Sequence, residues 1–183
     1  MNRTEILNNL FIGVQKNSTD MLEKKPSGLD GIEMYLFIRP EGRADFIAKL
    51  KDGALEHEGI DRAEAWKRAE ENTHAETKIT SMSEIIFGVK DPDDQLFVIT
   101  NSTGVKGAGA ITDRESIKKW AGEHGTHRIL VLPSSVHEMI IADADKVGAS
   151  GNLEEFNHMV TEVNNTEVSP EERLTDRAYL MEV

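Results

Sequence analysis

The chain has 183 residues, a length that fits one domain with its own buried core, and 38% of them are hydrophobic. It contains no cysteine, which excludes disulfide bonds, cysteine-ligated metals and a cysteine nucleophile. The net charge of −12 favours basic protein surfaces over nucleic acids as partners, although an acidic surface also serves solubility alone. No apolar run approaches the roughly 18–20 residues that span a bilayer, and no signal peptide is evident, so we expect a cytoplasmic protein without membrane contacts.

The apolar pattern predicts several helices and one strand in the N-terminal half. Leu7, Leu10, Phe11 and Val14 recur at helical intervals, which predicts an amphipathic helix followed by a loop at 24–28. Beyond this loop we expect a strand at 32–38, a short helix at 44–50, a helix at 61–72 and a helix at 81–87. The last of these begins with a capping box, and its apolar residues share one face.

The C-terminal half shows the clearest pattern. Strands and helices alternate there without the regular βαβ spacing of a parallel sheet. The sequence therefore predicts an α+β fold, with a mixed or antiparallel sheet covered by amphipathic helices. We expect strands at 95–100, 127–132, 136–142 and 177–183, helices at 113–122 and 153–163, and a glycine-rich hairpin at 104–109.

The chain is predicted to form a single domain over 1–183, because it has no internal repeat and no low-complexity linker. If the chain divides into two lobes, we expect the seam between them in the segment 53–59, which is bounded by glycines. A break there would separate an N-terminal lobe, 1–55, from a main body, 56–183.

Three residues that follow a predicted strand are the candidates for catalysis: Ser135, His137 and Glu138. A serine nucleophile needs a neighbouring base, so a hydrolase is one hypothesis. These residues are very close in sequence and no Gly-x-Ser-x-Gly turn is present, so the simpler interpretation is a capped turn pinned by His137. The glycines of 104–109 lack the ending of a phosphate loop, and the histidines lack metal-binding spacing. We therefore predict no catalytic residue, no cofactor and no metal.

One local cluster of basic residues stands out in this acidic chain. Its members are Lys106, Arg114, Lys118, Lys119 and Arg128. Arg114 and Lys118 lie one helical turn apart and share a face. The cluster is a candidate for phosphate contacts, whereas a solvated helix face is the simpler interpretation.

Several segments of the chain resemble one family of unknown function. They are 66–73, 97–101, 107–111, 129–138 and 159–176. The most specific elements are Leu-Pro-Ser-Ser-x-His-Glu, within 129–138, and Pro-Glu-Glu-x-Leu-x-Asp, within 159–176. The family is common in gut bacteria, their phages and other mobile elements. The resemblance implies no enzymatic activity and no catalytic residue.

Some family members of similar length resemble anti-CRISPR proteins of type II-A. The resemblance thus implies an inhibitor that binds an RNA-guided effector nuclease with its guide RNA, with double-stranded DNA as a second partner, and prevents target binding or cleavage. The basic channels of such a nuclease suit an acidic partner, and acid concentrates here at 51–76 and 150–183, with net charges of −4 and −6. The predicted contacts are Glu70, Glu71, Glu154 and Glu155. The alternative is an accessory protein of a mobile element with another partner.

Overall fold

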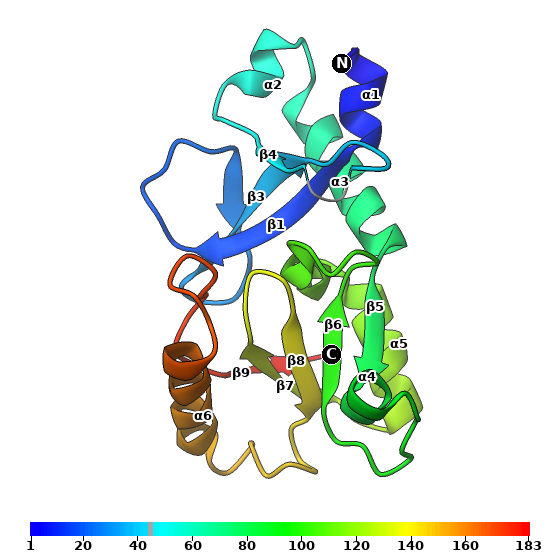
Figure 1. The fold of residues 1–183 in the computed structure, drawn as a ribbon, viewed down its shortest axis with the longest axis vertical. Helices are drawn as coiled ribbons and strands as arrows, with labels where there is room; N and C mark the ends of the chain where they lie inside the picture. Colours follow the sequence, from blue (N-terminus) through cyan, green and yellow to red (C-terminus); the bar gives the residue numbers. More distant parts are fainter. Residues whose placement is uncertain (44–45) are drawn as a thin grey trace.

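Two antiparallel sheets with flanking helices make up the protein (Figure 1). The computed structural model describes residues 1–43 and 46–183. The strands of the first sheet are β1 (Leu10–Lys16), β2 (Lys24–Pro26), β3 (Ile32–Ile38) and β4 (Ala48–Lys49). Those of the second are β5 (Lys78–Ser81), β6 (Phe97–Thr100), β7 (Arg128–Pro133), β8 (Met139–Asp143) and β9 (Tyr179–Glu182). Neighbouring strands follow the orders β1-β3-β2, with β4 beside β3, and β5-β6-β8-β7-β9.

Helices precede, connect and cover these strands. They are α1 (Arg3–Asn8), α2 (Ala54–His57), α3 (Arg62–Ala75), α4 (Met82–Phe87), the 3-10 helix η1 (Gly107–Thr112), α5 (Arg114–His124) and α6 (Leu153–Thr166). Every strand pair formed by the described residues is antiparallel, so the predicted α+β class is confirmed. None of the helices in the described part of the chain is long and apolar enough to cross a membrane.

Alternation along β1 gives the first sheet two buried faces, because successive side chains of a strand point to opposite sides. Leu10 and Ile12 pack with Trp66 of α3 on one face. Phe11 packs on the other face, where its ring stacks on that of Phe37 with centroids 5.8 Å apart. The first sheet is therefore a core layer, covered on one side by α1 and α3.

One apolar cluster joins the two sheets. Its members from the strands include Val14, Ile32, Ile99, Ile129 and Met139. The 3-10 helix η1 lies between the sheets and contacts β1, β6 and α3. The backbones approach so closely here that a Cβ added to Gly109 would overlap the carbonyl oxygen of Ile12. Only glycine fits at this junction without moving β1.

The segment 53–59, predicted as a seam, contains α2 and the turn that leads into α3. Helix α3 follows this segment in sequence yet packs back on β1, which precedes it. The chain passes from the first sheet to the second only after α3, at the start of β5. The passage between the two sheets therefore lies after α3.

The predicted helix over 7–14 is wrong. Helix α1 ends at Asn8, and the Asn9 side chain donates to the carbonyl of Glu5 at 2.8 Å. Residues 10–16 then form β1 and pair with β3 along their whole length. Long-range pairing outweighs a helical spacing that extends over only two turns.

Four further differences concern short elements. The hairpin predicted at 104–109 is replaced by η1, which begins after Lys106 in a left-handed conformation with φ of 52°. The loop predicted at 24–28 contains β2, and β5 was not predicted. The segment 44–50, predicted as a helix, contains β4, whereas its residues 44–45 lie outside the described part of the chain. Such short strands form because a neighbouring strand supplies their hydrogen bonds.

Candidate functional site

The residues of the hydrolase hypothesis form a hydrogen-bonded turn between β7 and β8. The Ser135 hydroxyl oxygen accepts the backbone N–H of His137 at 3.0 Å, and the Ser135 N–H donates to the carbonyl of Glu138 at 3.1 Å. The His137 Nδ1 accepts the backbone N–H of Lys106 at 3.1 Å, so the neutral ring carries its proton on Nε2 and donates to Glu172 at 3.1 Å. This bond lowers the pKa of the Glu172 carboxyl. Both ring nitrogens are engaged, and neither is free to take a proton from Ser135.

The four other predicted phosphate contacts do not gather in one place. Lys118 and Lys119 are exposed on α5. Arg114 begins the same helix and lines a cavity with residues of β2 and α3. Arg128 of β7 donates to Glu182 of β9 at 2.8 Å. The structure thus keeps Arg114, Lys118 and Lys119 on α5 and places Lys106 and Arg128 on other elements.

The four predicted acidic contacts occupy two distant helices. Glu70 and Glu71 are exposed on α3, whereas Glu154 and Glu155 are exposed in the first turn of α6. In Figure 1, α3 lies beside the first sheet and α6 lies at the far side of the second. The two pairs therefore do not belong to one surface patch.

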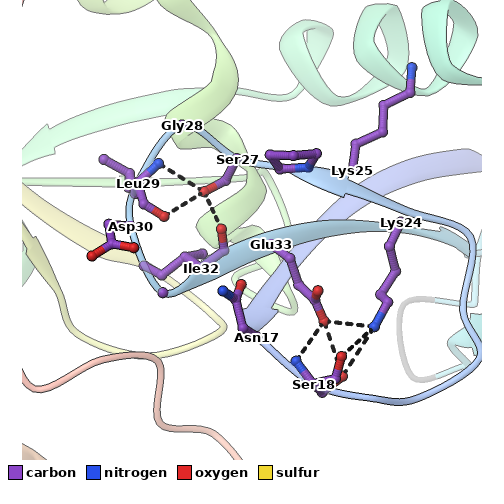
Figure 2. A pocket seen from close by; sticks show the side chains of 12 residues that line it. Asn17, Ser18, Lys24, Lys25, Ser27, Gly28, Leu29, Asp30, Ile32 and Glu33 are labelled. Atoms are coloured by element: carbon purple, nitrogen blue, oxygen red, sulfur yellow. Dashed lines mark hydrogen bonds and ion pairs between the residues drawn. The ribbon is translucent and has the colours of Figure 1, made fainter.

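A cavity of about 640 Å³ lies between the loops that join β1, β2 and β3 (Figure 2). Two of its charged residues are paired: the Lys24 Nζ lies 3.1 Å from Glu33, and it also lies 2.8 Å from Asp20. Ser18 bonds to the same Glu33 oxygen at 3.0 Å, and the Ser27 hydroxyl donates to a backbone carbonyl at 2.6 Å. Because these groups are already paired, we interpret the network as one that holds the loops together. We call the network of Lys24, Asp20, Glu33 and Ser18 the Lys24 clasp.

Asp20 makes this clasp sensitive to acid. Burial alone would raise the pKa of Asp20, but hydrogen bonds from Lys24, Ser18 and Gln15 outweigh it and lower the pKa from 3.8 to about 2. A lowered folded-state pKa stabilises the fold above the unfolded-state value, and this contribution is lost as the pH falls from about 4 to about 2. We expect the Tm of the wild type to fall more steeply over that range than the Tm of Asp20→Asn. Because Asp20 is partly exposed, the difference should be about 2 °C, and parallel Tm profiles from circular dichroism would refute it.

Helix α4 has apolar side chains but buries none of its residues. Ile85, Ile86, Phe87 and Val89 are between 52% and 74% exposed, and we call these four residues the α4 surface. The sequence placed the apolar residues of this helix on one shared face, but no element formed by residues 1–43 and 46–183 buries them. Figure 1 shows α4 beside β5 at the outer edge of the second sheet, away from the first sheet. Several large apolar side chains exposed within one short segment are typical of an interaction site.

Hydrogen bonds fix the loop that follows α4. Gly88 ends the helix in a left-handed conformation with φ of 70°. The Ser83 hydroxyl accepts the N–H of Asp91 at 3.0 Å and bonds to the Asp94 carboxylate, which also accepts the Ser83 N–H at 3.2 Å. These bonds from Ser83 lower the pKa of Asp94. The α4 surface is therefore held in one conformation, which reduces the entropy lost on binding.

Carboxylates flank the α4 surface in the sequence. Within 82–95 the only basic residue is Lys90. The acidic residues of this segment are Glu84, Asp91, Asp93 and Asp94. An apolar centre with an acidic rim is complementary to a basic surface that carries an apolar or aromatic anchor.

A cavity of about 390 Å³ adjoins α4 and is lined by an aromatic cluster. The rings of Trp120 and His124 stack with centroids 4.5 Å apart, and Phe97 meets Trp120 edge-on at 5.1 Å. Glu84 and Glu123 line the same cavity. Lys90 lines it too, 3.8 Å from Glu84, so a cation of the chain itself already lies beside these carboxylates.

The α4 surface was not predicted as a binding site from the sequence, although the sequence contains a signal that apolar residues are exposed there. Three apolar residues in a row, followed by Gly88 and Val89, exceed what one face of a short helix can bury. Across residues 1–43 and 46–183, no group of three or more His, Asp or Glu side chains is arranged to hold a metal ion.

Comparison with known proteins identifies a family without an assigned role. A model described as a family of unknown function (DUF5688) matches residues 15–182, nearly the whole chain. No curated protein and no solved structure matches the chain.

Proposed function

The chain belongs to this family of unknown function, and we propose that it acts by binding a basic protein through the α4 surface, rather than by catalysis. The observation that supports this proposal is the α4 surface: three exposed apolar side chains at the end of α4 and a fourth, Val89, just after it, in a segment rich in carboxylates. His137, the candidate base, offers no free ring nitrogen, so the hydrolase hypothesis gains no support from its geometry.

The energetics favour Phe87 as the anchor of this contact. It is the most exposed of the four side chains, at 74%, and its burial in a partner would contribute about 2 kcal/mol. Aromatic anchors at the centre of an interface carry much of the binding energy. The surrounding carboxylates would act mainly on the association rate and on partner choice.

The partner that we propose is the RNA-guided effector nuclease of a type II CRISPR system. This partner follows from the resemblance of the chain to family members of phages and mobile elements of gut bacteria. Such a nuclease has basic channels for guide RNA and target DNA, and the charge of −12 on this chain is complementary to them. Binding there would prevent target binding or cleavage.

Substitution of Phe87 tests the proposal directly. We expect Phe87→Ser to raise the Kd for the nuclease–guide RNA complex about 30-fold, because a central aromatic anchor contributes about 2 kcal/mol. The matched control is Met21→Ser, which removes an equally exposed apolar side chain from the first sheet's β1–β2 loop and should leave the Kd within about twofold. Surface plasmon resonance on immobilised nuclease measures both values.

A charge reversal distinguishes the contribution of the carboxylates near the α4 surface from the contribution of Phe87. Asp93 is exposed, so Asp93→Lys should slow association several-fold and reduce its salt dependence while the dissociation rate changes little. Binding that neither Phe87→Ser nor Asp93→Lys affects would place the contact elsewhere on the chain. No binding of the wild type to the nuclease would reject the proposed partner and leave another mobile-element partner as the alternative.

A further inference from the structure

A second cavity, of about 400 Å³, lies where β2, α3 and the start of α5 meet. Three of its lining side chains are cationic: Lys25, Lys67 and Arg114. Lys25 neighbours Lys24 on β2, but the two side chains point to opposite sides of the strand, as Figure 2 shows. Lys25 therefore belongs to this cavity and has no part in the Lys24 clasp. The sequence did not group these three residues, because they lie on three elements.

The three cations are not neutralised within the protein. None of them forms an ion pair or a hydrogen bond with any residue in the described part of the chain, although Lys25 lies over the ring of Trp66, 4.5 Å from its centroid. The Arg114 guanidinium extends toward the turn at Gly28, and partial burial lowers its pKa. One carboxylate, that of Glu70, also lines the cavity. The lining thus carries three positive charges against one negative charge.

A buried carboxylate fixes the floor of the cavity. Glu23 accepts the indole N–H of Trp66 at 2.7 Å and the Nε–H of Arg62 at 2.5 Å. Trp66 is therefore held in one orientation beneath Lys25. The hydroxyls of Ser27 and Thr112, which also line the cavity, are already bonded to backbone carbonyls at 2.6 and 2.8 Å. The groups left for a ligand are the three cationic donors.

We propose that this cavity binds a small ligand that carries a phosphate group. Unpaired arginine and lysine donors that converge on a recess are the groups that recognise phosphate, arginine by a two-pronged contact and lysine as a point charge. The volume lies within the range of small-molecule sites. A small ligand is favoured over nucleic acid because the chain as a whole has a net charge of −12, which repels a long polyanion but leaves a local cationic recess accessible. This site is separate from the α4 surface.

Titration with inorganic pyrophosphate tests the proposal on the intact chain. Isothermal titration calorimetry at low salt should show saturable binding, and the indole N–H signal of Trp66 should shift in nitrogen–proton spectra. Arg114→Gln and Lys67→Gln should each raise the Kd about tenfold, because each removes one charged contact. Neither residue has a partner among the described residues, so the fold should survive, as circular dichroism would verify.

Two further variants make the outcome decisive. Glu70→Gln removes the single lining carboxylate and should tighten pyrophosphate binding about two- to fivefold, a gain that unfolding cannot produce. Lys16→Gln, at the exposed end of β1, changes the net charge equally and should leave the Kd unchanged. Absence of saturable binding, or equal weakening by Lys16→Gln, would overturn the proposal. Binding of a short DNA duplex that Arg114→Gln weakens, without pyrophosphate binding, would overturn the small-ligand assignment.

Discussion

Gly109→Ala is expected to lower the free energy of unfolding by about 3 kcal/mol or more, the largest loss that we predict for a single methyl group. The new Cβ would overlap the carbonyl oxygen of Ile12 and lie 2.9 Å from its carbonyl carbon. Both are backbone atoms of β1, which is paired along its length with β3 and cannot move alone. The two sheets would have to separate at η1. Urea denaturation followed by circular dichroism measures the change.

Gly122→Ala is the matched control for Gly109→Ala. Gly122 lies inside α5, and a Cβ there meets nothing within 4 Å. The alanine should raise the free energy of unfolding by about 0.5–1 kcal/mol, because glycine is a poor helix former. Equal unfolding midpoints for Gly109→Ala and the wild type would show that the two sheets do not meet as closely at η1 as described.

Glu76→Ala should cost about 3 kcal/mol, because it leaves a buried cation without its partner. The Arg39 guanidinium donates to the two carboxylate oxygens of Glu76 at 2.5 and 2.6 Å and lies over the ring of Phe11, 4.1 Å from its centroid. The Arg39 side chain is only 6% exposed, and without Glu76 it keeps only a hydrogen bond to the Thr103 hydroxyl at 3.4 Å. This pair ties the end of β3 to the end of α3. Thermal and urea unfolding should both register the loss.

Glu71→Ala provides the comparison for Glu76→Ala on the same helix. Glu71 pairs with Arg68 at 3.0 Å, but both side chains are nearly half exposed, and such surface pairs contribute less than about 0.5 kcal/mol. A loss of similar size in the two variants would mean that burial does not distinguish the pairs. It would thereby refute the argument for Arg39.

The local sequence pattern was sufficient to predict a helix or strand where the residues of that element alone determine its structure. The strand at 32–38 was predicted with its bounds, because apolar residues on both of its faces suit a central strand. Helix α3 and the cap of α4 were predictable for the same reason: Asp61 and Ser81 accept the N–H groups of Glu64 and Glu84. By contrast, β1 and η1 depend on contacts with distant strands, which no local spacing reveals.

The candidate sites were less predictable than the fold, because they depend on what covers a residue. The sequence could place Ile85 and Ile86 on a helix, but not show that no other element packs on them. Likewise, Arg114 was recognised as a cation, whereas its neighbours Lys25 and Lys67 come from other elements. Which charged residues lie close together depends on how the sheets and helices are arranged. From the sequence, only the fold class of that arrangement was predicted.

We propose that the chain inhibits an RNA-guided nuclease by binding it through the α4 surface. A target-DNA cleavage assay with purified type II effector, guide RNA and increasing amounts of this protein tests it most directly. We predict dose-dependent loss of cleavage with full-length guide RNA, and a dose–response curve shifted about 30-fold to higher concentration with Phe87→Ser. Unchanged cleavage at a large molar excess of the wild type, or loss of cleavage accompanied by a shortened guide RNA, would contradict the claim.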